Sequence, residues 1–161
     1  MNRRALLALL ALTPMAACSR FVDYDGPEVT RVVVWKNDRL MSLFHGEVVL
    51  ESYEVELGFA PDGHKFEYGD GRTPEGEYLI DRRNPDSEFY LSIGINYPNA
   101  EDIARAQEAG VDPGGDIFIH GTPRPFRNTD DWTVGCIAVT NREMRQIFAM
   151  VPNGTPITIH P

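Results

Sequence analysis

The sequence predicts one mainly β domain, a sandwich or barrel-like fold that carries two short α-helices. Most of its apolar residues stand in short, β-branched runs, and turn signals separate these runs. Only two segments combine helix caps with the apolar spacing of a helix. The chain has 161 residues, of which 42% are hydrophobic and 24% charged, so its length and composition fit a single globular domain.

The strands are expected where β-branched and aromatic residues recur along the chain. Turn-forming residues at 36–38 and 45–47 divide the first three runs into an antiparallel meander. The third run alternates from Glu51 onward, as a half-buried strand does. Residues rich in Gly, Asp and Pro then form an irregular surface loop before the fourth run. The expected strands are 30–35, 40–44, 48–57, 77–81, 88–96 and 156–160.

Two segments carry helix signals. Asn99 is a good N-cap for residues 100–109, and Gly110 ends that helix. Thr140 and Glu143 form a capping box at the start of a second helix, which Pro152 stops. The apolar residues of the second helix recur at the spacing that packing against a core requires, which predicts a buried face made of Met144, Ile147, Phe148 and Val151.

The charge balance excludes one class of partner. The formal net charge is −9, and no basic run or basic-aromatic stripe occurs in the chain. Such a surface repels a phosphate backbone, so we expect no nucleic-acid partner.

The N-terminal residues resemble a bacterial lipoprotein signal. Arg3 and Arg4 precede an apolar segment that is too short to span a bilayer, and small residues then precede Cys18. We expect residues 1–17 to be a signal peptide, 18–28 a tether lipidated at Cys18, and 29–161 the folded domain. By the same resemblance, Ser19 favours a lipid anchor in the outer membrane of a Gram-negative bacterium, with the domain in the periplasm. The alternative is an ordinary secretory signal with a cysteine near its cleavage site.

Cys136 and His120 are the candidate catalytic residues. Fifteen residues separate them, and each ends or begins a short β-type segment. A free thiol is mostly protonated at neutral pH, so a nucleophilic cysteine needs a base such as histidine. If Cys18 carries lipid, Cys136 has no disulfide partner. From these residues alone the alternative stays open that Cys136 is a buried small residue beside a core histidine.

Longer motifs around these two residues resemble a known family. The segments 120–122 (His-Gly-Thr) and 133–137 (Thr-Val-Gly-Cys-Ile) are similar to the catalytic motif of the L,D-transpeptidases of the YkuD type. The segment 71–78 (Gly-Arg-Thr-Pro-Glu-Gly-Glu-Tyr) is similar to the Thr-Pro-x-Gly-x-Tyr/Phe segment of the same family. The resemblance covers nearly the whole domain and implies the family's β-sandwich with two short helices.

The resemblance implies a two-step acyl transfer on peptidoglycan stem peptides. Cys136 would form a thioester with meso-diaminopimelate of a tetrapeptide stem and release D-alanine, and an amine would then accept the acyl group. His120 would act as base and then acid, oriented by the carbonyl of Gly121. Backbone amides near Gly135, assisted by Thr133, would bind the oxyanion. No metal or organic cofactor is expected, and we expect a monomer.

Two arginines are candidates for binding the substrate. Arg124 and Arg127 lie in the loop between the two halves of the catalytic motif. In an acidic protein they are the remaining candidates for contacting the carboxylates of a stem peptide. The alternative is that this loop is simply solvated.

The sequence also departs from the family pattern. Val134 stands where many members carry His, and Ala138 stands where many carry Arg or Asn. The segment is similar to a divergent branch with a hydrolytic member, so the alternatives are a hydrolase of the same fold, either an L,D-carboxypeptidase or an amidase that releases lipoprotein. A further alternative is a peptidoglycan-binding module without catalysis.

Overall fold

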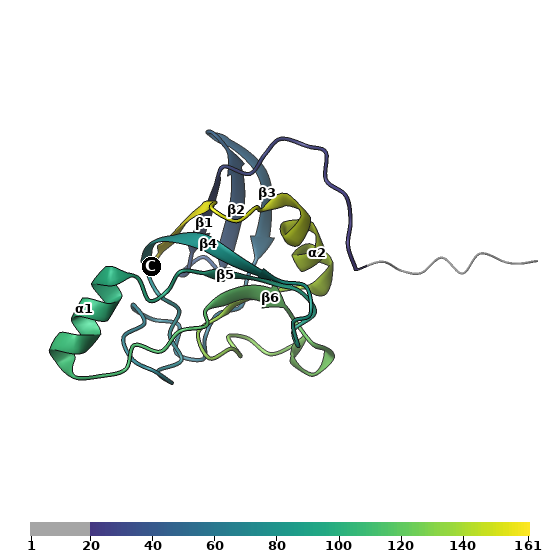
Figure 1. The fold of residues 1–161 in the computed structure, drawn as a ribbon. Helices are drawn as coiled ribbons and strands as arrows, with labels where there is room; N and C mark the ends of the chain where they lie inside the picture. Colours follow the sequence, from purple (N-terminus) through teal and green to yellow (C-terminus); the bar gives the residue numbers. More distant parts are fainter. Residues whose placement is uncertain (1–19) are drawn as a thin grey trace, which may run out of the picture.

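The computed structural model describes residues 20–161, which form an eight-stranded sheet, two α-helices and one short 3₁₀-helix (Figure 1). The strand order is β3-β2-β1-β8-β4-β5-β6-β7. The elements are β1 (Arg31–Trp35), β2 (Leu40–His45), β3 (Val48–Glu54), β4 (Gly76–Asn84), β5 (Ser92–Ile95), α1 (Ala100–Ala109), β6 (Phe118–Gly121), η1 (Arg124–Phe126), β7 (Ile137–Val139), α2 (Asn141–Met150) and β8 (Pro156–His160).

Strand β4 belongs to both halves of the sheet. Its first residues, Gly76 to Leu79, pair with β8, whereas the residues from Ile80 onward pair with β5. The register shifts between Ile80 and Arg82, and such a bulge bends a strand and increases its twist. In Figure 1 the strands β4, β5 and β6 run across the view while β1, β2 and β3 rise above them. The sheet therefore folds into two layers, which confirms the predicted mainly β sandwich.

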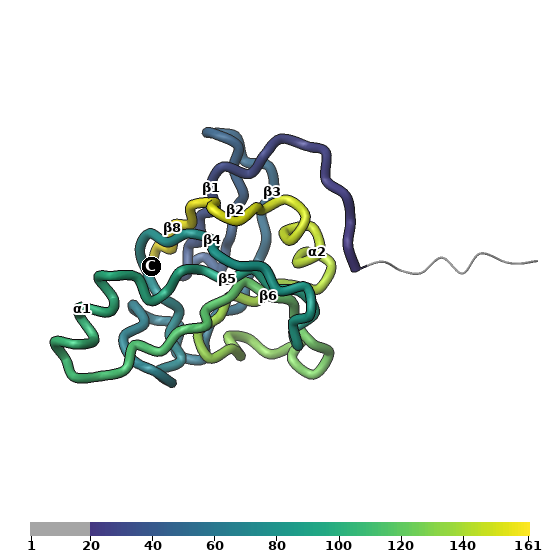
Figure 2. The backbone as a smooth tube through the Cα atoms, viewed as in Figure 1, coloured from purple at the N-terminus to yellow at the C-terminus, as the bar shows by residue number. Residues whose placement is uncertain are grey.

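The two edges of the sheet also meet, because the segment that follows β3 lies against β7. Glu56 N donates to Ala138 O at 2.9 Å, and Ala138 N donates to Glu56 O at 2.8 Å. Phe59 N donates to Thr133 O at 2.9 Å. Figure 2 shows the loop after β3 and the loop before β7 at the same lower side of the molecule. These contacts join the residues on either side of Cys136 to the opposite edge of the sheet.

The core lies between the two layers and under α2. The capping box of α2 is formed as expected, since Glu143 N donates to Thr140 Oγ1 and Thr140 N donates to Glu143 Oε2. Helix α1 has the expected N-cap and ends at Gly110 in the left-handed conformation. The fully buried apolar side chains come from both layers and from α2, and include Val32, Met41, Leu43, Leu57, Ile80, Ile93, Ile119, Ile137, Met144, Ile147 and Ile159.

Two expected strands are shorter in the structure than the sequence predicted. Residues 48–57 were expected as one strand, but β3 ends at Glu54 because the chain then crosses to pair with β7. Residues 88–96 were expected as one strand, but only Ser92–Ile95 forms β5. Tyr90 has a φ of 79°, and the carbonyl of Phe89 accepts the amide of Gly121, so residues before β5 form a turn beside the end of β6.

The expected signal peptide, tether start and lipidation site at Cys18 lie outside the described residues. Between residues 20 and 161, no helix has both the length and the apolar character needed to cross a bilayer.

Candidate active site

His120 is held at the end of β6 in the middle of the second layer. Its register partners are Ser92 on β5 and Ala138 on β7, and only 3% of its surface is exposed. Its Nδ1 lies 2.8 Å from Gly121 O. A carbonyl oxygen can only accept, so Nδ1 carries the proton and Nε2 of the neutral ring is left as a base.

Aromatic rings fix the imidazole of His120. Phe89 stacks on it with ring centroids 4.6 Å apart, and Trp132 meets it edge-on at 5.5 Å. Phe126 stacks in turn on Trp132 at 4.4 Å. Burial lowers the pKa of His120, and the hydrogen bond to Gly121 O offsets part of this effect. The ring is therefore neutral, and able to accept a proton, at neutral pH.

Cys136 stands directly before β7 and opens into the same pocket as His120. This pocket has a volume of about 410 Å³, and Phe89 and Phe118 are among its other walls. The thiol is half-buried and donates to Asp116 O at 3.5 Å. Burial raises the pKa of Cys136, whereas the backbone amide of Phe118 lowers it. The resting pair is thus a neutral thiol and a neutral imidazole, so a thiolate forms only when a proton passes to the base.

The turn before Cys136 depends on Thr133 and Gly135. The hydroxyl of Thr133 donates to Cys136 O at 2.7 Å and accepts from Gly135 N at 3.1 Å. Gly135 has a φ of 124°, and a Cβ there would lie 2.5 Å from Arg72 O. Thr133 therefore holds the turn together, and the Gly135 amide is already engaged within it. The expected part of these two residues in oxyanion binding stays a prediction.

Arg124 and Arg127 lie away from the thiol. Arg124 begins η1, Arg127 follows it, and both side chains are exposed. Among residues 20–161, neither lines a pocket that contains Cys136. Arg127 instead lines a separate pocket of about 580 Å³, to which the buried Ala138 also contributes. Their expected contact with the substrate stays a prediction. A longer side chain in place of Ala138 would lie in the separate pocket and not in the pockets of Cys136.

The sequence reasoning missed Arg82 and Asp116. Together with Cys136 they line a second pocket, of about 860 Å³. Nothing in the sequence marks Arg82, because it lies 54 residues from Cys136 and reaches it only through the pairing of β4, β5 and β6. Asp116 could have been noticed as the polar residue that precedes the apolar strand leading to His120.

Comparisons with known proteins identify the family. The model of the L,D-transpeptidase catalytic domain, or YkuD, family matches residues 29–159. The chain belongs to the L,D-transpeptidase family. It is 33% identical over 126 residues to YafK of Escherichia coli (strain K12), which is named as an L,D-transpeptidase, and the match covers 74% of this chain and 46% of YafK. The expected family is confirmed.

Solved structures agree in fold. The crystal structure of Pgp2, a helical cell shape determining protein of Campylobacter jejuni, matches with a TM-score of 0.65 and 24% identity over 83% of this chain and 48% of that chain. Bd1075 of Bdellovibrio bacteriovorus matches with a TM-score of 0.60 and 25% identity over 86% of this chain and 50% of that chain. The chain spans about half the length of these relatives.

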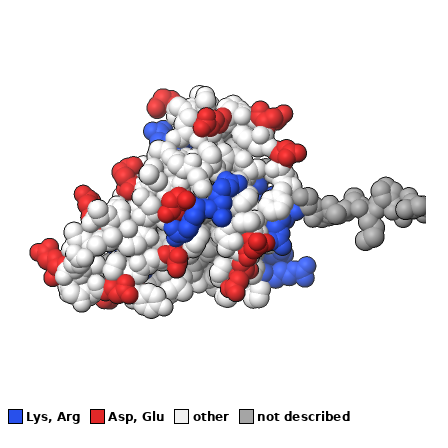
Figure 3. Space-filling view, in the orientation of Figure 1, with Lys and Arg blue, Asp and Glu red and all other residues white. Residues whose placement is uncertain are grey.

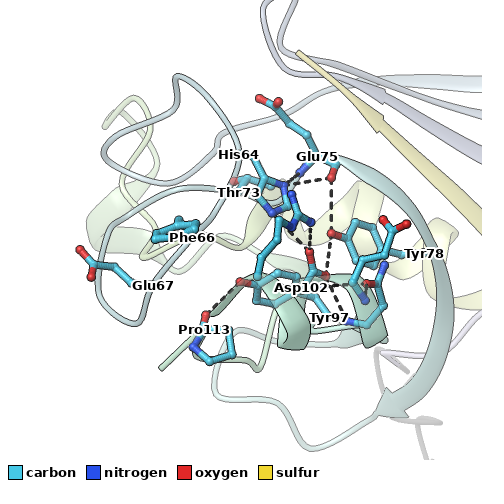
Figure 4. Close-up of polar contacts among 12 residues, drawn as sticks. His64, Phe66, Glu67, Thr73, Glu75, Tyr78, Tyr97, Asp102 and Pro113 are labelled. Carbon is cyan, nitrogen blue, oxygen red and sulfur yellow. Dashed lines mark hydrogen bonds and ion pairs between the residues drawn. The ribbon is translucent and has the colours of Figure 1, made fainter. Parts of the chain in front are cut away.

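The second family motif of this L,D-transpeptidase domain is anchored from two sides. Lys36, whose side chain is 2% exposed, binds Glu75 Oε1 at 2.7 Å and Thr73 O at 3.1 Å. Figure 4 shows His64 and Tyr78 pointing toward Asp102 of α1. His64 Nε2 lies 3.3 Å from Asp102 Oδ1, and its Nδ1 lies 3.0 Å from Glu75 N. His64 therefore links the motif to α1 and lines neither of the pockets that contain Cys136.

Proposed function

We propose that this chain is a peptidoglycan L,D-transpeptidase in which Cys136 is the nucleophile and His120 the base. One observation carries the proposal: the thiol and the imidazole line one pocket, and the hydrogen bond from Nδ1 of the ring to Gly121 O leaves Nε2 as the base. Membership of the L,D-transpeptidase family supports the same reaction, and the likeness to Pgp2, a helical cell shape determining protein, supports peptidoglycan as the substrate.

The first step would transfer an acyl group to sulfur. The Cys136 thiol gives its proton to His120 Nε2 as sulfur attacks the carbonyl carbon at the L-centre of diaminopimelate. The amide bond to D-alanine then breaks, and the departing nitrogen takes the proton from His120. Because the Gly135 amide donates to Thr133, the Cys136 amide is our candidate donor to the oxyanion. The product of this step is a thioester on Cys136.

The second step would pass the acyl group to an amine. The amine attacks the thioester carbon and loses a proton to His120, and the carbon–sulfur bond breaks as Cys136 recovers that proton. The only charged side chains in the pocket shared by His120 and Cys136, among the described residues, are the carboxylates of Glu88 and Asp116. The Glu88 carboxylate attracts the ammonium form of an acceptor, which attacks as the free amine after it loses one proton to solvent, and this favours an amine over water as acceptor. We further propose that residues 1–17 are the signal peptide that carries the chain to the periplasm, and that lipid on Cys18 anchors it there.

The test uses the full-length chain in detergent with purified sacculi, followed by separation and mass analysis of the muropeptides. We expect loss of terminal D-alanine together with new 3–3 cross-linked dimers, and neither product with Cys136→Ala. Shortened stems or freed lipoprotein without dimers would show the hydrolase alternative to be correct.

A second measurement separates catalysis from mere binding. We expect a carbapenem to add its mass to the peptide that contains Cys136, in the native chain but not in Cys136→Ala. Absence of any adduct in the folded native chain would favour the non-catalytic binding module.

A further inference from the structure

Arg82 is built into β4 in a fixed orientation beside the candidate active site. Its register partner is Gly94 on β5, and a Cβ at Gly94 would lie 2.6 Å from Arg82 Cγ and 2.7 Å from its Nε. Because Gly94 has no side chain, the side chain of Arg82 can lie directly against the backbone of β5. Phe118 of β6 is the next register partner beyond Gly94, and the guanidinium stands over its ring, 4.6 Å from the centroid.

The internal partners of Arg82 occupy only part of its guanidinium. Nη1 donates to both carboxylate oxygens of Asp81, each at 2.9 Å, and to Ile95 O at 3.2 Å. Nη2 faces Asp116 instead, at 3.6 Å from Oδ1. Its neighbour Arg83 is used differently, because both of its terminal nitrogens donate to carbonyls at the end of α2. Arg82 thus keeps one donor edge turned toward the pocket of Cys136.

Asp116 presents the opposite charge at the same place. Its backbone carbonyl accepts the Cys136 thiol, while its carboxylate is 92% exposed. It adopts a φ of 55°, which non-glycine residues rarely do. An exposed pair 3.6 Å apart contributes little to stability, so a ligand can replace its mutual contact without a large cost.

The other charged residues around this pocket have partners of their own. Lys65 Nζ binds Asp70 Oδ1 at 2.8 Å and Glu67 O at 3.1 Å. Asp112 Oδ1 accepts the amide of Gly114 at 2.8 Å. Figure 3 shows basic side chains gathered over β4 and β5 with acidic side chains around them. Arg82 and Asp116 therefore offer one positive and one negative group side by side at the thiol.

We propose that Arg82 and Asp116 together bind an α-amino-carboxylate group of the acyl donor, namely the D-centre of diaminopimelate. Arg82 pairs with the carboxylate of that group, and Asp116 pairs with its ammonium. This assignment rests on the proposed function, because there the L-centre of the same diaminopimelate residue delivers its carbonyl to Cys136. Both charges of the D-centre sit on one carbon, which matches the close spacing of the two side chains. The pair acts as a specificity determinant for stems that contain diaminopimelate.

Binding to the full-length Cys136→Ala chain, measured by calorimetry in detergent, tests this pair without turnover. The ligands are the tetrapeptide L-Ala-γ-D-Glu-meso-diaminopimelate-D-Ala, the same peptide with L-Lys, which lacks only the D-centre carboxylate, and the peptide acetylated on the D-centre amine. We expect the first peptide to bind about tenfold or more tightly than either of the others.

Variants assign each charge. In the same background, Arg82→Gln should remove the preference for diaminopimelate over lysine and leave the affinity for the lysine peptide within about twofold. Asp116→Asn should remove the preference for the free over the acetylated amine. Arg142→Gln, the same change at an exposed arginine of α2 that lines neither pocket of Cys136, should keep both preferences. Arg82→Lys keeps the charge and should retain part of the first preference, which guards against a folding defect in Arg82→Gln.

Equal binding of the diaminopimelate and lysine peptides to the parent chain would overturn the proposal, and so would a failure of the parent chain to bind either peptide. An equal loss of affinity for both peptides in Arg82→Gln would overturn it as well. If free D-alanine bound as tightly as the stem peptide, and Arg82→Gln weakened that binding, the pair would not be a site for the diaminopimelate of the acyl donor. Selective binding without D-alanine release by the native chain would refute the proposed function alone. Release of D-alanine from both peptides at equal rates, with equal binding, would refute this pair alone.

Discussion

Replacing Lys36 by methionine should strongly destabilise the domain, because this lysine is the buried cation that holds the second family motif. Its side chain is 2% exposed, and Nζ donates to Gly63 O at 2.5 Å, to Thr73 O at 3.1 Å and to Glu75 Oε1 at 2.7 Å. Methionine preserves the length of the stem but leaves a carboxylate and two carbonyls without this donor. Breaking one partner of a buried ion pair costs ~3–5 kcal/mol, which is a large share of the ~5–15 kcal/mol that stabilises a typical domain.

Urea unfolding followed by circular dichroism measures this loss as a shift in midpoint at unchanged slope. Glu75→Gln keeps an acceptor for the lysine and should cost less than Lys36→Met. The double variant Lys36→Met/Glu75→Leu removes both charges and should be more stable than Lys36→Met alone, because no unpaired carboxylate remains. A loss below about 1 kcal/mol in Lys36→Met, or no recovery in the double variant, would refute the reasoning.

Three further predictions concern the site itself. Cys136→Ser should abolish D-alanine release while the thermal midpoint stays within a few degrees, because the hydroxyl is far less acidic than the thiol; retained release would contradict the nucleophile. Burial holds the pKa of His120 below its ordinary value of 6.5. As the pH falls through 6.5, His120 therefore becomes protonated in the unfolded chain while it stays neutral in the folded chain, and this favours unfolding. Stability to urea should therefore fall between about pH 7 and pH 5. Burial also lowers the pKa of His64, so His120→Gln should reduce this dependence without removing it, whereas an unchanged slope would count against a buried neutral imidazole. Gly58→Ala should cost ~1–3 kcal/mol and reduce activity, because its Cβ would lie 2.0 Å from Gly71 O and 2.9 Å from Gly135 N. Gly115→Ala, where a Cβ meets nothing closer than 3.7 Å, is the stability control and should be near neutral.

Local signals carried most of the fold. The N-caps at Asn99 and Thr140 and the stop signals at Gly110 and Pro152 defined α1 and α2 to within a residue, because caps satisfy backbone groups through neighbours only a few positions away. Strand positions followed from β-branched runs, but strand ends did not. The ends of β3 and β5 depend on partners distant in the sequence, and the crossing of β3's continuation to Ala138 leaves no mark in the local pattern.

The sequence alone determined the family and the two residues that form the candidate pair, His120 and Cys136, because motif spacing survives as a short local pattern. Tertiary structure decided what surrounds them. Pairing of β4, β5 and β6 brings Arg82 to the thiol, while the loop arginines 124 and 127 lie outside its pockets. The physical reason is that strand register decides where a charged side chain such as that of Arg82 lies. The register depends on contacts between strands along the whole sheet, and no single segment of the sequence encodes these contacts.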